Sequence, residues 1–331
     1  MPFFFSSSLA PQAAPSGGGV YHRAVDILLQ QIFNGLTLGS IYALVALGYT
    51  MVYGIMGLIN FAHGEVVMVG ALSAVAVMKP LADSGLPGPV ILLIALLVAV
   101  VVCMCLGFSI ERIAYRPLRG APRLAPLITA IGVSIVLQQL AMLAWGRNYH
   151  AVPTLLPAGS HEVFGAQVTE LQVIILVVAA VTMAGLMLLV NRTRLGRAMR
   201  ATAENPAIAG LMGVDVNRII ATTFVIGSAL AALAGVLVSA NYGIAHYHMG
   251  FMLGLKAFTA AVLGGIGNLP GAMLGGVLLG LIEALGAGYI GDLTGGFLGS
   301  HYQDVFAFFV LIVVLVFRPS GLMGEKVSER A

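Results

Sequence analysis

Apolar residues fall into nine blocks along the chain, mostly separated by short polar or glycine-rich stretches. About 20 consecutive apolar residues cross a bilayer as an α-helix, because a helix satisfies its own backbone hydrogen bonds. The blocks lie at 27–47, 60–78, 89–110, 126–145, 171–190, 219–238, 252–267, 270–287 and 304–317. The third and the fifth carry no charged residue in VILLIALLVAVVVCMCLGFSI and LQVIILVVAAVTMAGLMLLV. The pattern predicts an all-α polytopic membrane protein.

Two places leave the number of spans at eight or nine. Segment 48–59, GYTMVYGIMGLI, either lengthens the first helix or forms a bent or re-entrant piece. Blocks 252–267 and 270–287 are short and are interrupted by GIGNLPG, so they fit broken or re-entrant helices. Irregular backbone inside a membrane must be buried in protein or line a cavity, and short interrupted spans point to a transport path.

Composition supports a membrane protein. The 331 residues are 59% hydrophobic and only 9% charged, with a net charge of +3, whereas soluble domains carry about 25% charged residues. A nucleic-acid-binding function has no support from this charge. We expect a flexible N-terminal extension at 1–26, a transmembrane domain at 27–325 and a short tail at 326–331.

Basic residues set the predicted orientation. Twelve of the sixteen lysines and arginines form three clusters. These are Arg112, Arg116, Arg119 and Arg123; Arg192, Arg194, Arg197, Arg200 and Arg218; and Arg318, Lys326 and Arg330. Loops rich in Lys and Arg face the cytoplasm. The N-terminus and segments 146–170 and 287–303 are therefore expected outside.

Five polar residues at membrane depth are candidates for a translocation path or gate: Asn60, His63, Glu65, Lys256 and Glu283. Asn60 and Glu65 also fit simple roles as a helix cap and a first-turn acid. A charge inside a span usually faces the bundle interior with a partner, so Lys256 is expected to pair with Glu283 or Glu65. We interpret Gln138 and Gln139 as interhelical hydrogen-bonding residues.

Glycines repeat at four-residue spacing in several blocks. Gly35 and Gly39 form one such pair, and Gly276 and Gly280 form another. Small residues at this spacing let helices approach closely in lipid. We expect helix packing from them, with a glycine-lined gate as the alternative.

Segment 191–218 resembles a piece of soluble protein. Asn205 is suited to cap a short helix that begins at Pro206. Its apolar stripe consists of Ala207, Ile208, Leu211 and Met212, and Gly213 is expected to end the helix. A short amphipathic helix outside the membrane should dock on its own bundle, on headgroups or on a partner.

Motifs for catalysis are missing from the sequence. It holds no GxxxxGK[ST], GxSxG or HExxH, so nucleotide binding through a P-loop is excluded and no enzyme activity is expected. We also expect no metal site and no cofactor. Energy for active transport must then come from an ion gradient or from a partner.

Four stretches carry a family resemblance: Asn34–Glu65, Leu195–Val214, Lys256–Gly276 and Phe317–Glu325. Together they resemble the LivH-type permease subunits of branched-chain amino acid ABC importers. The resemblance implies ABC importer permease architecture in a bacterial plasma membrane. It also implies two cytoplasmic ATPase subunits, a second homologous permease and a periplasmic amino-acid-binding protein as partners.

The resemblance further implies that segment 191–218 is a coupling loop seated on an ATPase. Glu204, Asn205, Pro206 and Gly213 match the family's loop, with the apolar stripe between them. Two alternatives remain at this stage. One is a related permease for urea, short amides or other amino acids. The other is an autonomous channel or ion-coupled carrier that uses Glu65, Lys256 and Glu283.

Overall fold

The computed structural model describes residues 18–122, 124–156, 159–293 and 302–324. Each of the nine predicted blocks coincides with one helix, which confirms the all-α polytopic fold. The helices are α1 (Gly18–Met56), α2 (His63–Leu81), α3 (Gly88–Ile110), α4 (Leu124–Trp145), α5 (Glu170–Arg192), α8 (Val216–Tyr242), α9 (Met249–Gly264), α10 (Leu269–Leu293) and α11 (Gln303–Phe317).

Seven of the described helices are long and apolar enough to cross a membrane. The remaining two, α9 and α11, are apolar but have only 16 and 15 residues. The expectation of short helices among the last spans is thus met by α9, whereas α10 is 25 residues long.

The first helix resolves the question of segment 48–59. Helix α1 continues to Met56, where Gly57 with a φ of 64° ends it, so most of the segment lengthens the first span. Its 39 residues correspond to about 58 Å, well beyond a hydrocarbon core of about 30 Å. Helix α1 begins at Gly18, within the segment assigned to the N-terminal extension. The predicted tail at 326–331 lies outside the described residues.

Short elements occupy the connections. A hairpin of β2 (Ser160–Val163) and β3 (Ala166–Thr169) fills the outer loop, and β1 (His150–Ala151) pairs with β4 (Ile244–Ala245). Helix α3 ends in a π-helical turn, η1 (Glu111–Tyr115), followed by η2 (Arg116–Leu118). The predicted cytoplasmic segment folds as α6 (Arg194–Glu204) and α7 (Pro206–Leu211).

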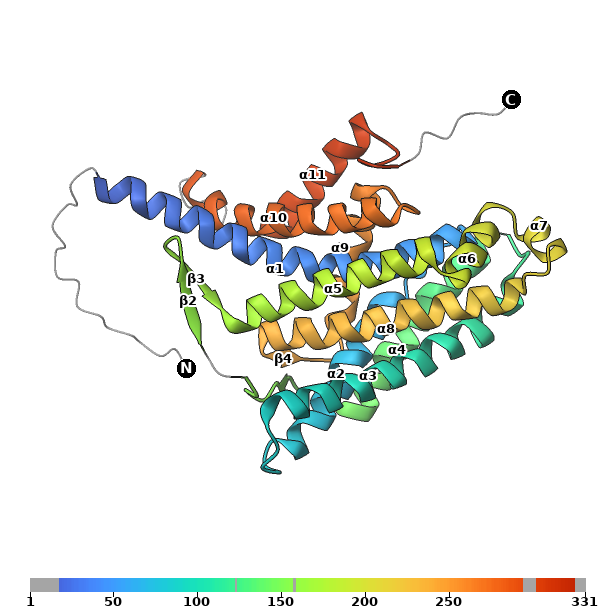
Figure 1. Ribbon diagram of the computed structural model, residues 1–331, viewed down its shortest axis with the longest axis horizontal. Helices are drawn as coiled ribbons and strands as arrows, with labels where there is room; N and C mark the ends of the chain where they lie inside the picture. Colours follow the sequence, from blue (N-terminus) through green and yellow to red (C-terminus); the bar gives the residue numbers. More distant parts are fainter. Residues whose placement is uncertain (1–17, 123, 157–158, 294–301, 325–331) are drawn as a thin grey trace.

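The two ends of the bundle differ in their elements. Figure 1 shows α6 and α7 at one end, and the β2–β3 hairpin with the start of α1 at the other. The arginines of these clusters that the structure describes gather at the α7 end. Arg119 of the first cluster donates a hydrogen bond to Asn217, beside Arg218 of the second. Near Arg318, Leu322 N donates to Leu263 O at the end of α9. Following the predicted orientation, we call this common end the cytoplasmic end and the opposite end the outer end.

Glycine packing joins α1 to α10, which lie side by side in Figure 1. A Cβ on Gly35 would lie 2.9 Å from the Cα of Leu281, and one on Gly39 would lie 2.8 Å from the Cα of Val277. Gly276 and Gly280 approach α1 equally closely from the other side. The four-residue glycine spacing therefore packs these helices, as predicted.

The first and last thirds of the bundle share one arrangement. Gly57 ends α1 and Gly243 ends α8, each with a positive φ, and the next helix begins six residues later at His63 and at Met249. Helix α1 packs on α10, and α8 packs correspondingly on α3. Because α1 runs toward the cytoplasmic end and α8 runs away from it, α1–α2–α3 and α8–α9–α10 form an inverted pair.

Candidate translocation and coupling sites

Two helix N-termini meet inside the bundle, at the centre of the inverted pair. A Cβ on Gly254 of α9 would lie 2.9 Å from the Cα of Gly64, and Gly250 faces Gly64 backbone to backbone. His63, the first residue of α2, contacts Gly48 of α1. Gly48 lies eight residues before the end of α1, which corresponds to about 12 Å along the helix axis. The helices α2 and α9 therefore begin at membrane depth. Interrupted helices of this kind form the central sites of many transporters.

Asn60 and His63 fix the connection between α1 and α2. Asn60 Oδ1 accepts hydrogen bonds from Ala62 N at 3.1 Å and from Tyr115 Oη at 2.8 Å. Ala62, and not Asn60, is the residue that precedes α2, so Asn60 supports the turn before the helix. His63 is buried between α1 and α8, with its ring edge-on to Tyr49 at a centroid distance of 4.9 Å.

Glu65 is enclosed in the first turn of α2 and is 1% exposed. Its Oε1 accepts hydrogen bonds from Gln138 Nε2 at 2.7 Å and from Ser134 Oγ at 3.1 Å, both on α4. Its Oε2 has no hydrogen-bond partner among the described residues and faces Gly250 in the first turn of α9. The interhelical role predicted for Gln138 is confirmed, whereas Gln139 is exposed on α4.

A cavity of about 380 Å³, which we call the intramembrane cavity, opens between α4 and α9 at this level. Its lining residues are Tyr49, Phe61, Ile131, Ser134, Ile135, Gln138, His248, Phe251 and Leu255. Ser134 and Gln138 separate it from Glu65. The cavity is apolar apart from Tyr49 and a few polar side chains on α4 and at the start of α9.

Lys256 belongs to a separate ionic cluster. Its Nζ lies 3.3 Å from Glu283 Oε2 on α10 and 2.6 Å from Asp304 Oδ1 on α11. Tyr42 Oη of α1 donates to Glu283 Oε2 at 2.7 Å. Of the two partners expected for Lys256, the structure selects Glu283 and not Glu65. The cluster therefore ties together the helices α1, α9, α10 and α11.

Asp304 and Tyr42 were not predicted as partners in this cluster. Asp304 is the acidic residue at the start of the last apolar block. From the end of a short span, its side chain can reach a buried lysine on a neighbouring helix. Tyr42 gives no such signal, because a tyrosine in an apolar helix usually serves packing.

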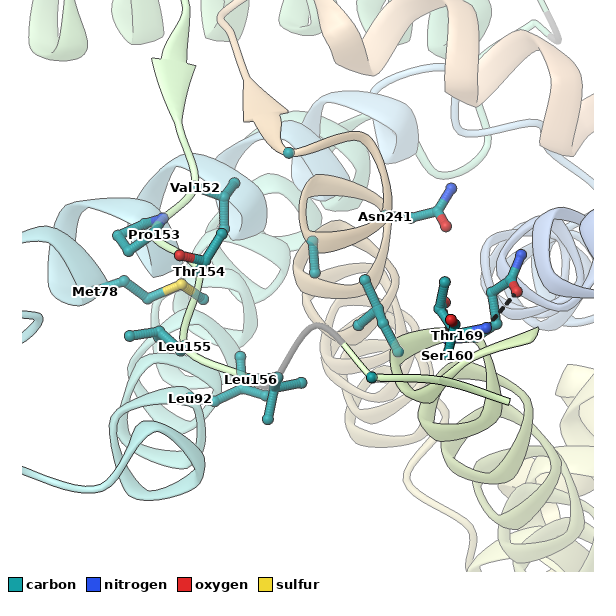
Figure 2. Close-up of a pocket in the computed structure, with 15 residues that line it drawn as sticks. Met78, Leu92, Val152, Pro153, Thr154, Leu155, Leu156, Ser160, Thr169 and Asn241 are labelled. Atoms are coloured by element: carbon teal, nitrogen blue, oxygen red, sulfur yellow. Dashed lines mark hydrogen bonds between the residues drawn. The ribbon is translucent and has the colours of Figure 1, made fainter. Parts of the chain in front are cut away.

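A second cavity of about 450 Å³ lies at the outer end, between α2, α3, α5 and α8. Figure 2 shows Met78, Leu92 and the segment Val152–Leu156 on one side, and Ser160, Thr169 and Asn241 on the other. The first wall is apolar apart from Thr154, and the opposite wall offers hydroxyl and amide groups. The cavity thus forms a recess at the outer end of the bundle.

At the cytoplasmic end, α7 projects from the bundle (Figure 1). Asn205 Oδ1 accepts from Ala207 N and Ile208 N, both at 3.1 Å, and Pro206 occupies the first turn, as predicted. Among the remaining residues of the predicted coupling set, Glu204, Leu211, Met212 and Gly213 are all exposed. Gly213 has a φ of 87° and ends the helix region.

The three large apolar side chains on and directly after α7 do not fold back onto the bundle. Leu211 is 87% exposed and Met212 is 81% exposed, and Ile208 is also exposed. Ala209, one helix face away, is the residue that packs inward. The free apolar edge is therefore available to a partner.

A polar contact next to α7 was also not predictable from the sequence. Arg119 forms an ion pair with the buried Glu111 of η1 and donates to Asn217 near the start of α8. The short stretch between α7 and Asn217 is therefore tied to the π-helical end of α3. Arginine clusters near a membrane face are so common that this contact gives no distinct sequence signal.

Comparisons with known proteins agree with this geometry. The family model described as the permease component of branched-chain amino acid transport systems matches residues 31–315. The high-affinity branched-chain amino acid transport system permease protein BraD of Pseudomonas aeruginosa is 51% identical over 316 residues, which cover 94% of this chain and 99% of BraD. LivH of Escherichia coli strain K12, a protein of the same description, is 47% identical over 307 residues, with 91% and 97% covered.

The similarity extends to an archaeal protein. A probable branched-chain amino acid transport permease protein LivH of Methanocaldococcus jannaschii is 28% identical over 306 residues, which cover 90% of this chain and 94% of that protein. No solved structure gives a significant match. From the family match and the extent of the bacterial similarities, the chain belongs to the family of branched-chain amino acid transport permeases.

Proposed function

We propose that the chain is the membrane-spanning permease subunit of an ABC importer that carries leucine, isoleucine and valine across the bacterial plasma membrane. The substrate class is that of relatives that are 47–51% identical over more than nine-tenths of the chain. Two cytoplasmic ATPase subunits drive the transport, a second homologous permease completes the path, and a periplasmic binding protein delivers the amino acid.

The exposed apolar edge of α7 is the observation that supports an ATP-driven importer most directly. Ile208, Leu211 and Met212 stand free at the cytoplasmic end, next to the arginines of α6. An autonomous channel or ion-coupled carrier has no need for such an edge. In our proposal the edge sits in a groove of an ATPase subunit, with Glu204, Asn205, Pro206, Ala207 and Gly213 shaping the loop.

The five polar candidates at membrane depth divide into two roles in this proposal. Glu65 lies beside the path, and Asn60 and His63 hold the start of α2 in place. Lys256 and Glu283 position α9 against α10 and α11 through their ion pair. The path thus carries few charges, which suits substrates with aliphatic side chains.

Reconstitution tests the proposal. Vesicles that contain this chain, the second permease and the ATPases should accumulate labelled leucine when the loaded binding protein is outside and ATP is inside. Omitting the ATPases should abolish accumulation. Uptake that persists without ATPases, or that follows an imposed ion gradient, would instead establish a carrier or channel.

A further inference from the structure

The intramembrane cavity between α4 and α9 lies where the two interrupted helices begin. His248 directly precedes α9, and both Ser134 and Gln138 contact Glu65 in the first turn of α2. The residues at its mouth, Ile131, Ile135 and Phe251, are exposed at the surface of the bundle. In many transporters the site between inverted repeats, at the ends of discontinuous helices, holds the substrate.

One side of the cavity carries hydrogen-bond acceptors that suit a cation. Ser134 Oγ gives its only proton to Glu65 and can offer only lone pairs to a ligand, whereas Gln138 uses one of its two N–H groups on Glu65 and keeps Oε1 as an acceptor. Gln138 Oε1 makes no hydrogen bond to any described residue. The carboxylate of Glu65 lies behind Gln138 and Ser134, and its buried Oε2 has no hydrogen-bond partner among the described residues. An ammonium group is the ligand that this set of acceptors fits.

The other side of the cavity lies at a helix N-terminus, which suits an anion. Helix α9 begins at Met249, and no side chain caps its N-terminus. Met249 N already donates to His246 O, and Glu65 Oε2 faces Gly250, so it is the positive end of the helix dipole, shared with Glu65, that favours a carboxylate near His248. The cavity thus offers complementary surroundings to the two charges of a zwitterion.

The remaining walls are aliphatic and aromatic. Phe61, Phe251 and Leu255 face Ile131 and Ile135 across the cavity. A volume of about 380 Å³ is at the small end of the range for ligand sites, about 300–1,000 Å³. A compact, branched aliphatic group fills such a space and excludes water, whereas a charged side chain would be buried without a partner.

We propose that the intramembrane cavity is a binding site for an aliphatic α-amino acid during its passage through the membrane. The ammonium group lies toward Gln138, Ser134 and Glu65, the carboxylate toward the start of α9, and the side chain against the apolar walls. This inference rests on the proposed function and adds a substrate-binding site within the permease itself. A lipid acyl chain is the competing occupant, but it would make no use of the polar groups.

Thiol labelling of the complete transporter tests the site. Ile135→Cys places a thiol in the cavity wall. Ile128→Cys places one two turns away on the same face of α4, outside the cavity, with comparable exposure of 66% against 53%. Both are made in a Cys105→Ser background, since the other native thiol, Cys103, is buried. The reagent is N-ethylmaleimide, which is uncharged and membrane-permeant and reacts with the thiolate of those cysteines that water reaches.

L-Leucine, delivered by its binding protein, should slow labelling of Ile135→Cys at least fivefold and leave Ile128→Cys unchanged, and L-glutamate should protect neither. Ile135→Trp, which fills the cavity, should reduce leucine uptake at least tenfold, whereas Ile128→Trp should not. Unaltered labelling of Ile135→Cys in a transporter that still accumulates leucine would overturn the site and leave the proposed function intact.

Two further outcomes separate the remaining explanations. Protection of Ile135→Cys that is independent of leucine and disappears on delipidation would identify a lipid chain as the occupant and refute the inference. Absence of leucine uptake by the unmodified complete transporter would refute the proposed function itself. The uptake measurement on the unmodified complex is therefore made first.

Discussion

Tyr115 and Asn60 are joined by a hydrogen bond of 2.8 Å, although 55 residues separate them. Tyr115 ends the π-helical turn η1, whose first residue, Glu111, is paired with Arg119. Asn60 supports the turn that starts α2. π-Helical turns often mark functional positions. The bond therefore connects the region beside α7, the proposed coupling helix, with the helix start at membrane depth.

Tyr115→Phe removes this bond and keeps the buried ring. A hydrogen bond of this kind contributes about 1 kcal/mol, or roughly a fivefold effect on a coupled equilibrium. We expect ATP hydrolysis to continue while leucine accumulated per ATP falls severalfold. Uptake and hydrolysis are measured together in reconstituted vesicles. Tyr149→Phe, at an exposed tyrosine in the outer loop, is the control, and an unchanged ratio for Tyr115→Phe would argue against transmission through this bond.

Gly64→Ala should disturb the crossing of α2 and α9. The added methyl group would meet Gly250 O and lie 2.8 Å from the Cα of Gly254, and backbone atoms cannot move aside. Overpacking of this type costs about 1–3 kcal/mol. Thermal unfolding of the purified protein should show a clear loss of stability. Gly132→Ala, on α4 with no atom within 4 Å of the new Cβ, should be neutral or slightly stabilising; equal behaviour of both variants would contradict the close approach.

Hydropathy predicted where the helices lie, because backbone N–H and C=O groups in lipid have no water to bond. A single segment can satisfy these groups internally only as a helix. It did not predict which side of each helix faces inward. Gln138 and Gln139 look equivalent in sequence, but one residue of helix rotates a side chain by about 100°, and only Gln138 reaches Glu65. Lys256 likewise had two possible partners, and only the packing of α9 on α10 decides between them.

The meeting of α2 and α9 had a signal in the sequence that the prediction did not use. Gly57 and Gly64 are separated by seven residues, and so are Gly243 and Gly250. This equal spacing marks the corresponding breaks of the inverted pair. The β2–β3 hairpin carried a weaker signal, since strands of four residues are too short for a reliable alternation of polar and apolar positions.

Lys256→Met should destabilise the protein strongly, because Glu283 and Asp304 lose their shared cation. Removing one partner of a buried ion pair costs about 3–5 kcal/mol. Adding Glu283→Gln to Lys256→Met removes one of the uncompensated charges and should recover part of the loss. Thermal unfolding in detergent measures both variants. Lys79→Met, at an exposed lysine next to His150, should have little effect on stability. An equal loss of stability in Lys79→Met would show that the ionic cluster is no more important than a surface lysine.

Gly213→Pro should deform the loop that we propose to couple the permease to the ATPase. Gly213 has a φ of 87°, whereas proline fixes φ near about −65°, so the backbone after α7 cannot keep its course. We expect normal membrane insertion, because the site is exposed and outside the spans, together with loss of ATPase association. Co-purification of the ATPase with the tagged permease measures it. Retained association at the level of the unmodified chain would show that the loop geometry is not required.

Leu211→Ser combined with Met212→Ser tests the apolar edge without altering the backbone. Burying two such side chains contributes about 3 kcal/mol or more, so their loss should weaken ATPase binding roughly a hundredfold. Ile113→Ser is the matched control, since Ile113 is 75% exposed at the same end of the bundle but lies on η1. Binding of purified ATPase to the permease in nanodiscs gives the affinities. If Ile113→Ser weakened binding as much as the double variant, the ATPase would contact a wider surface; if neither did, α7 would not be the docking element.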